Sequence, residues 1–188
     1  MSYKEANEGK ENPKFKKNKK DGYFYNCTLC TATHLLRRRG FNIQVSPNIV
    51  SKKYKDGELY EFYKQKKMTW RERFLNKDGT SPTYISSAEW SKRKQIKKMT
   101  DKHLDSFLKE TLSNDSLYEI VIAKKSIPEA HVFCAETIKG KTIYFDPQNG
   151  NHDASDYFID ADPYWVEVLK IDNKIINTKI GSLFLPIK

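Results

Sequence analysis

The first candidate for chemistry in this chain is Cys27, which follows Asn26 and opens a stretch rich in helix signals. Asparagine is a good N-cap residue because its side-chain oxygen can accept a backbone N–H left unpaired at a helix start. Apolar residues then recur at helical spacing, and arginines and a glycine close the stretch, as suits a helix C-terminus. They are Ala32, Leu35 and Leu36, then Arg37, Arg38, Arg39 and Gly40. The pattern predicts a helix with Cys27 in its first turn, where the helix dipole stabilises a thiolate and makes a thiol nucleophilic.

A base and a carboxylate for this thiol come about a hundred residues later. His131 and Asp146 lie in two strand-like runs that flank the turn Lys139-Gly140-Lys141, a pattern that predicts a β-hairpin. Because His131 opens the first strand and Asp146 closes the second, we expect the antiparallel hairpin to bring imidazole and carboxylate side by side. An aspartate that holds one ring nitrogen orients the other toward a nucleophile. Cysteine at a helix start, followed by histidine and a carboxylate on a hairpin, is the order of the papain-like hydrolases.

Three segments resemble the papain-fold toxin family, whose members are often described as glutamine deamidase domains. The segments are Asn26-Cys27-x-x-Cys30 with Arg37-Arg38-Arg39-Gly40-Phe41, then Ala130-His131-Val132 with Tyr144-Phe145-Asp146-Pro147-Gln148-Asn149-Gly150, and the lead-in Ala6-Asn7-Glu8-Gly9 with Asn12-Pro13-Lys14-Phe15. Such domains form the C-terminal parts of bacterial polymorphic toxins and of phage minor head proteins. The resemblance does not extend to residues 51–126. It implies that Cys27 is the nucleophile, His131 the base and Asp146 the third member of a triad, with Gln148 as a further motif residue.

The fold expected for the chain is α+β, of the papain-like type, with a central helix that carries Cys27 packed on an antiparallel sheet. The 188 residues suffice for one such domain, and we assign it residues 21–188. Residues 1–20 are rich in lysine, glutamate, asparagine and glycine with little to bury, which predicts a flexible basic N-terminal arm or a linker. Residues 70–75 are expected to be helical, with Trp70, Phe74 and Leu75 on a buried stripe and Arg71 and Arg73 outside.

Two features of the predicted site have alternatives: the donors to the oxyanion and the cysteine that attacks. The oxyanion that forms when a thiolate attacks a carbonyl needs hydrogen-bond donors, and the backbone N–H of Cys27 is the expected first donor. The second donor is Asn26 or a residue near Tyr23 to Tyr25, and Asn26 and Gln148 are candidates for the oxyanion hole or for support of the site. Cys30, one helical turn on, is the alternative nucleophile, although the helix dipole acts most strongly in the first turn and so favours Cys27.

A structural zinc site is a second class of interpretation. Two residues separate Cys27 from Cys30, and two separate His131 from Cys134, which is a spacing typical of zinc ligands. However, strand alternation points Cys134 away from the His131 face, where we expect a small buried residue. We therefore predict neither a metal nor another cofactor. A third interpretation, a non-catalytic basic module that binds nucleic acid or a phage structure, explains the charge but not the cysteine, histidine and aspartate.

The net charge of +10 bears on the partners, because it attracts acidic proteins, nucleic acid or anionic membranes. We expect an acidic target protein. Nucleic acid is an alternative that is not favoured, because no usual binding signature is present, and no stretch is long and apolar enough to cross a membrane. The resemblance to toxins implies deamidation of a glutamine side chain, with proteolysis or isopeptide cleavage as the alternative. It also implies a cognate immunity protein and upstream toxin or phage head domains.

Cysteine usage and the N-terminal residues bear on localisation. Three cysteines are too few and of the wrong parity for a disulfide framework, and they favour a reducing compartment. The N-terminal residues are charged and lack an apolar core, so we expect no signal peptide. These features predict action in a reducing cytoplasm. Delivery into a target cell would depend on a signal in another part of the protein or on another export route.

Overall fold

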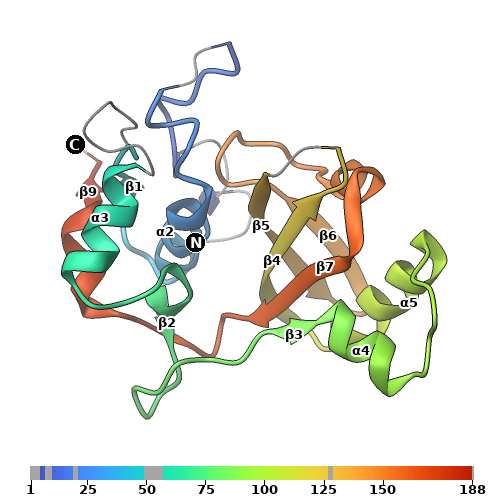
Figure 1. Cartoon of the computed structure of the whole chain (residues 1–188). Helices are drawn as coiled ribbons and strands as arrows, with labels where there is room; N and C mark the ends of the chain where they lie inside the picture. Colours follow the sequence, from blue (N-terminus) through green and yellow to red (C-terminus); the bar gives the residue numbers. More distant parts are fainter. Residues whose placement is uncertain (1–4, 7–9, 19–20, 49–56, 127–128, 188) are drawn as a thin grey trace. The chain divides into compact units, whose positions relative to one another are not determined.

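The computed structural model describes residues 5–6, 10–18, 21–48, 57–126 and 129–187. Their contacts divide the chain into two compact units (Figure 1). The first unit comprises Met1–Pro82, Asp146–Asn151 and Asn173–Lys188, and the second comprises Thr83–Phe145 and His152–Asp172. Neither unit begins or ends near residue 20, where the sequence analysis set a boundary. The turn Asp146–Asn151 belongs to the first unit, although Phe145 before it and His152 after it belong to the second.

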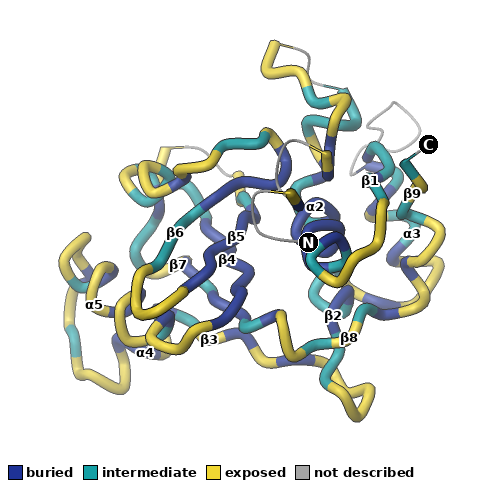
Figure 2. The backbone as a smooth tube through the Cα atoms, turned by 180° about the vertical axis from the view of Figure 1, so that it is seen from behind, coloured by how far each residue is buried: buried dark blue, intermediate teal, exposed yellow. Residues whose placement is uncertain are grey.

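Helix α2 (Cys27–Arg38) is the central element of the first unit. It begins at the predicted residue and ends as the glycine predicts: Gly40 has a φ of +98°, which a residue with a side chain rarely adopts. The N–H of Gly40 donates to Arg37 O at 2.9 Å and that of Phe41 to Leu36 O at 3.1 Å, the paired bonds of a Schellman motif. In Figure 2 the helix is dark blue over most of its length, because polar as well as apolar faces are buried.

Short elements complete the first unit. They are β1 (Ile43–Val45), α3 (Glu58–Gln65), the 3₁₀ helix η1 (Trp70–Arg73), β2 (Phe74–Leu75), β8 (Ile175–Ile176), the 3₁₀ helix η3 (Thr178–Leu183) and β9 (Phe184–Pro186). Strand β1 pairs antiparallel with β9, and β2 with β8, so the last residues of the chain complete sheets begun before residue 76. Helix α2 packs on β1. The core cluster of this unit holds Leu29, Cys30, Val45, Leu59, Tyr63, Met68 and Ile180.

The second unit is a five-stranded antiparallel sheet with helices packed on one face. Its elements are β3 (Ile85–Ser86), α4 (Ser87–Arg93), α5 (Asp101–Thr111), β4 (Ser116–Lys124), β5 (Ala130–Ile138), β6 (Lys141–Phe145), the 3₁₀ helix η2 (Ser155–Ile159) and β7 (Ala161–Lys170). The strand order is β3-β7-β4-β5-β6. Alternate strand residues such as Ile120, Ile122 and Phe133 face a core that includes Trp90 of α4 and Phe107 of α5, whose rings lie 5.8 Å apart.

These elements confirm the α+β class and the predicted hairpin. Strands β5 and β6 pair in register from Cys134–Phe145 to Ile138–Lys141. The turn residues Lys139 and Gly140 have φ values of 51° and 73°, the two positive values that a two-residue hairpin turn needs.

Residues 70–75 do not form the predicted helix. The 3₁₀ helix η1 starts with a capping box between Thr69 and Glu72, and the chain then passes directly into β2. Arg73, expected outside, is fully buried: its Nη1 donates to Thr31 Oγ1 of α2 at 3.1 Å. Helical periodicity missed this arrangement because the partner of Arg73 lies far away in the sequence.

Where the structure describes it, the N-terminal segment is not the predicted flexible arm. Ala6 and Glu11 are fully buried. Arg37 of α2, itself 1% exposed, donates from Nε to Ala6 O at 3.0 Å, and the Val45 N–H donates to Glu11 O at 2.8 Å. The segment is held because a buried guanidinium and a strand N–H need acceptors. Residues 7–9 of the lead-in, and residues 19–20 at the end of the predicted arm, lie outside the described residues.

Candidate functional site

Cys27 is the first residue of α2, and its side chain is partly exposed. The N–H groups of Leu29 and Cys30 both donate to Asn26 O, at 2.9 and 3.2 Å. No group among the described residues accepts a hydrogen bond from the backbone N–H of Cys27 or of Thr28. Such orphan donors are inherent to a helix start unless a side chain caps them. The start of α2 therefore offers a thiol beside two open backbone donors.

Asn26 occupies the N-cap position, but the predicted capping hydrogen bond is absent. Its Nδ2 donates to Ser46 O at 3.1 Å and to Asn12 Oδ1 at 3.3 Å, and its Oδ1 accepts from Asn12 Nδ2 at 3.2 Å. The side chain is fully buried. Asn26 does not cap the helix because partners elsewhere in the first unit engage both ends of its amide.

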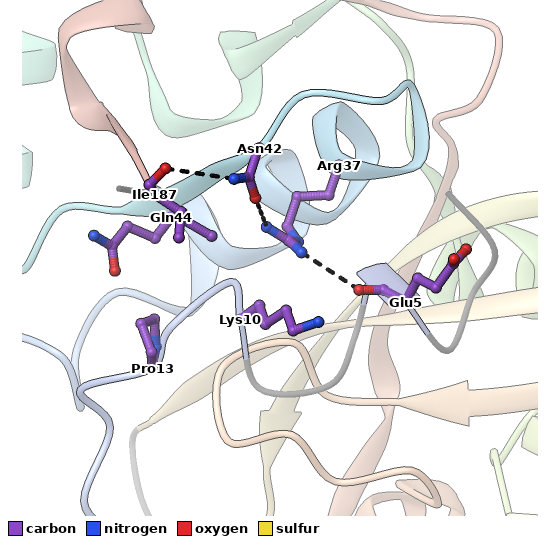
Figure 3. A pocket seen from close by; sticks show the side chains of 7 residues that line it. All are labelled: Glu5, Lys10, Pro13, Arg37, Asn42, Gln44 and Ile187. Carbon is purple, nitrogen blue, oxygen red and sulfur yellow. Dashed lines mark hydrogen bonds between the residues drawn. The ribbon is translucent and has the colours of Figure 1, made fainter.

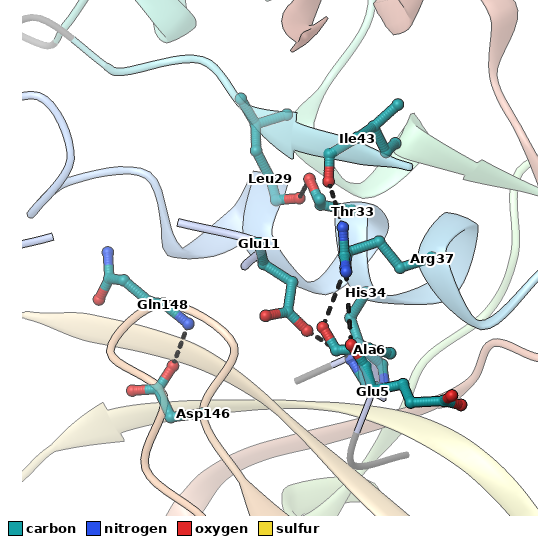
Figure 4. Close-up of polar contacts among 10 residues, drawn as sticks. All are labelled: Glu5, Ala6, Glu11, Leu29, Thr33, His34, Arg37, Ile43, Asp146 and Gln148. Carbon is teal, nitrogen blue, oxygen red and sulfur yellow. Dashed lines mark hydrogen bonds and ion pairs between the residues drawn. The ribbon is translucent and has the colours of Figure 1, made fainter. Parts of the chain in front are cut away.

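Gln148 lies in a turn that follows β6 and is closed by a bridge between Asp146 and Asn151. The backbone N–H of Gln148 donates to Asp146 Oδ1 at 2.9 Å (Figure 4). Its side-chain Nε2 donates to Phe24 O at 2.9 Å and to Asn26 Oδ1 at 3.4 Å. The first unit thus brings together three of the sequence-predicted site residues, Asn26, Asp146 and Gln148, at the start of α2.

These hydrogen bonds determine whether the side-chain amides of Asn26 and Gln148 can donate to a substrate. Both N–H groups of the Asn26 amide and both of the Gln148 amide already donate within the protein. In this arrangement neither amide has an N–H group left for an oxyanion, and both amides tie together the residues around the start of α2. The donors that α2 offers are the backbone N–H groups of Cys27 and Thr28.

His131 belongs to the second unit, where it is partly buried near the start of β5. Its ring centroid lies 6.1 Å from that of Phe133, in a stacked arrangement, and 5.5 Å from that of Tyr157, in an edge-to-face arrangement. These contacts put His131 on the Phe133 face of the strand and Cys134 on the other, as strand alternation predicts. The pairing of β5 with β6 ends at Cys134 and Phe145, before His131 and Asp146 are reached. Hairpin pairing therefore does not by itself fix the spacing of these two residues, contrary to the expectation from sequence.

The remaining cysteines are both fully buried. Cys30 lies in the core cluster of the first unit, and its Sγ donates to Asn26 Oδ1 at 3.5 Å. Cys134 lies within β5 and pairs with Glu119 and Phe145 of the neighbouring strands. In the part of the chain that the structure describes, no group of three or more His, Cys, Asp or Glu side chains is arranged to hold a metal ion.

A buried acid–histidine pair lies next to this network and was not foreseen. Glu11 Oε1 and His34 Nδ1 are 2.8 Å apart, and both side chains are fully buried (Figure 4). The pKa of Glu11 is raised to about 8, chiefly by burial; the charge of Asp146 adds to the rise, while a backbone hydrogen bond and Arg37 oppose it. Burial lowers the pKa of His34 well below its usual range, helped by Arg38 and Arg37. The pair is therefore neutral at pH 7.

Glu11, Asn12, Asn26 and His34 form a buried polar layer between the N-terminal segment and α2, and the sequence gives one weak signal for it. Asn12 belongs to the lead-in of the family resemblance, whereas Glu11 lies in a charged stretch and His34 in a helix, where neither stands out. Asn26, Cys30 and His34 recur every four residues and so share one stripe of the helix, from which Asn26 and His34 contact Asn12 and Glu11 of the N-terminal segment. Only the structure shows that this stripe is buried and polar.

The first unit also contains a cavity of about 470 Å³ (Figure 3). It is lined by Glu5, Lys10, Pro13, Arg37, Asn42, Gln44 and Ile187. The guanidinium of Arg37 points to Asn42 Oδ1 and Glu5 O at its wall. None of the lining residues is a candidate catalytic residue, so the cavity is separate from the start of α2.

Among the described helices, none has both the length and the apolar character needed to span a membrane. Comparisons of the chain with protein-family models, with curated proteins and with solved structures find no match.

Proposed function

We propose that the chain is a papain-like cysteine amidohydrolase with Cys27 as its nucleophile. One observation carries the proposal: a partly exposed thiol opens a buried helix, beside two backbone N–H groups that no described residue engages. A thiol at a helix start with oxyanion donors beside it is the arrangement that acyl transfer requires. The full burial of Cys30 further supports Cys27 over this alternative nucleophile.

The proposed reaction has two steps. Cys27 Sγ attacks the carbonyl carbon of an amide while His131 takes the thiol proton, and the oxyanion accepts hydrogen bonds from the N–H groups of Cys27 and Thr28. Collapse of this intermediate breaks the C–N bond, and His131 gives its proton to the leaving amine. His131 then removes a proton from water, which attacks the thioester and releases the acid and the free thiol. Asp146 has the role of orienting His131.

The proposed substrate is a glutamine side chain on an acidic target protein. The resemblance of the motifs to glutamine deamidase domains supports the reaction, and the net charge of +10 supports an acidic target. Cleavage of a peptide or isopeptide bond would use the same steps with a different leaving amine. Action in a reducing cytoplasm, a cognate immunity protein and upstream toxin or phage head domains belong to the same proposal, because they follow from the same resemblance.

The test is the intact mass of acidic candidate target proteins after incubation with the chain. Deamidation replaces an amide by an acid and adds about one dalton, whereas proteolysis yields fragments. We expect the gain with the wild type and with Cys134→Ala, which removes a buried thiol of the second unit, but not with Cys27→Ala. A gain that persists in Cys27→Ala and disappears in Cys30→Ala would overturn the assignment of the nucleophile.

A further inference from the structure

We propose that Asn12 is a positioning residue, which holds the Asn26 side chain away from the start of α2 so that the Thr28 N–H stays open for the substrate oxyanion. The inference deepens the proposed function and rests on it. It goes beyond the triad because it gives the N-terminal segment a role in the site.

Helix α2 has a good capping residue, Asn26, at its N-cap position. An asparagine at the N-cap position ordinarily accepts a hydrogen bond from the backbone N–H two or three residues on. For Asn26 these groups belong to Thr28 and Leu29. Leu29 N–H already donates to Asn26 O at 2.9 Å, which leaves the Thr28 N–H as the natural partner of the side chain. The Asn26 side chain makes no such bond.

The partners of Asn26 explain why the cap does not form. Asn12 and Asn26 exchange hydrogen bonds through their amides, at 3.2 and 3.3 Å. Ser46 O accepts from the same Asn26 amide at 3.1 Å, and Gln148 Nε2 donates to its oxygen at 3.4 Å. Asn12 is the one partner in this group that engages both ends of the Asn26 amide, so it determines the direction in which that amide points.

Asn12 is itself held in place by the fold. It is 2% exposed, and its Nδ2 also donates to Tyr23 O at 2.8 Å and to Gln148 O at 2.9 Å. These bonds tie Asn12 to the segment before α2 and to the turn that carries Asp146. Loss of the Asn12 amide removes all of these contacts at once. The Asn26 oxygen then keeps only the longer bonds from Gln148 Nε2 at 3.4 Å and Cys30 Sγ at 3.5 Å, and we expect it to turn toward the stronger donor at the start of its own helix.

The consequence is a specific prediction for the variant Asn12→Ala. Its Asn26 side chain caps α2, the Thr28 N–H becomes hydrogen-bonded, and one oxyanion donor is lost. Loss of one such donor lowers kcat by about 100-fold or more in acyl-transfer enzymes, with little effect on substrate binding. We expect Asn12→Ala to lower kcat by about 10- to 100-fold while KM stays unchanged.

The matched variant is Asn12→Ala combined with Asn26→Ala, in which no side chain remains to cap the helix. If Asn12 acts through Asn26, the double variant has a higher kcat than Asn12→Ala alone. If Asn12 only stabilises the fold, the double variant is worse, because it loses the remaining bonds of Asn26. Asn12→Leu, which keeps the approximate size of the side chain and removes both its N–H donors and its acceptor, serves in the same way where Asn12→Ala does not fold.

The experiment has two readouts, of which one needs no substrate. Amide hydrogen exchange measured by NMR reports the Thr28 N–H directly: we expect it to be unprotected in the wild type, at least about tenfold slower in Asn12→Ala, and unprotected again in the double variant. Turnover of p-nitrophenyl acetate or of a glutamine peptide gives kcat and KM. A Thr28 amide that exchanges equally fast in all three proteins, or a double variant slower than Asn12→Ala, overturns the proposal. A wild type without turnover contradicts the proposed function, while the exchange rates still decide the role of Asn12.

Discussion

Replacement of Glu11 by glutamine tests the neutral state of the buried Glu11–His34 pair. The pKa of Glu11 is about 8 in the folded protein against an ordinary value of 4.5, chiefly because the carboxyl is buried. Between these two values the unfolded chain releases the proton of Glu11 while the folded protein keeps it. The stability that Glu11 contributes is therefore fully present below pH 4.5 and is lost as the pH rises through about 8.

The size of this effect follows from the two pKa values. Each pKa unit corresponds to about 1.4 kcal/mol, so the difference between 4.5 and about 8 amounts to about 5 kcal/mol when the whole range is crossed. Between pH 5 and pH 8 the loss is about 3 kcal/mol. His34 acts in the opposite direction: its folded pKa lies well below 6.5, so its contribution is lost as the pH falls. The His34 shift arises from burial, Arg38 and Arg37, none of which the substitution of Glu11 changes, so we expect the same His34 contribution in wild type and variant at each pH.

Glutamine has the shape of a protonated glutamate and does not ionise. We expect Glu11→Gln to gain about 3 kcal/mol of unfolding free energy relative to the wild type when the pH is raised from 5 to 8. Urea unfolding followed by circular dichroism at both pH values measures the difference. The exposed Glu89, replaced by glutamine, is the control and should show no such change. A difference between Glu11→Gln and wild type that is the same at both pH values would refute the neutral pair.

Three further substitutions test other parts of the account. Cys30→Ala should keep activity and lower stability by about 1 kcal/mol, because it removes a buried thiol; loss of turnover in a folded variant would identify Cys30 as the nucleophile. Gly40→Ala should cost about 1 kcal/mol in thermal unfolding, owing to its φ of +98°, whereas Gly181→Ala, which also meets open space, should cost less. Arg37→Met should cost about 3 kcal/mol by leaving the buried Ala6 carbonyl and the half-buried Ile43 carbonyl without this donor, and should speed proteolysis of the N-terminal segment; unchanged proteolysis would contradict the attachment of this segment to α2.

Sequence reasoning succeeded where the cause of a structure is local. The end of α2 before Gly40 follows from charge and glycine signals that lie within a few residues, and α2 starts at Cys27 as predicted although the predicted capping bond is absent. The β5–β6 hairpin follows from two strand-like runs around a turn that needs positive φ. Such features need no knowledge of distant partners.

Reasoning from sequence failed where a distant partner decides the outcome. Asn26 sits at the predicted N-cap, yet Asn12 and Ser46 draw its side chain away from the helix. Arg73 was expected at the surface, yet it is buried against Thr31. In each case the polar group has a partner more than ten residues away, which local patterns and periodicity do not encode.

The N-terminal segment shows how composition can mislead. Its lysines, glutamates and asparagines predict disorder, because they offer little apolar surface. The described residues are held by polar contacts instead: Asn12 pairs with Asn26, Glu11 with His34, and Ala6 O accepts from Arg37. The candidate site is therefore built on a buried polar layer between this segment and α2, and hydropathy does not reveal such a layer.

The central claim is that Cys27 is a nucleophile activated by His131, and its most direct test is the rate at which each cysteine reacts with iodoacetamide. Peptide mapping by mass spectrometry separates Cys27, Cys30 and Cys134 in one experiment. Our account predicts that Cys27 reacts first at pH 6, and that His131→Ala slows this reaction about tenfold or more, because the thiolate loses its imidazolium partner. Equal rates in the wild type and in His131→Ala, or faster labelling of Cys30, would contradict it.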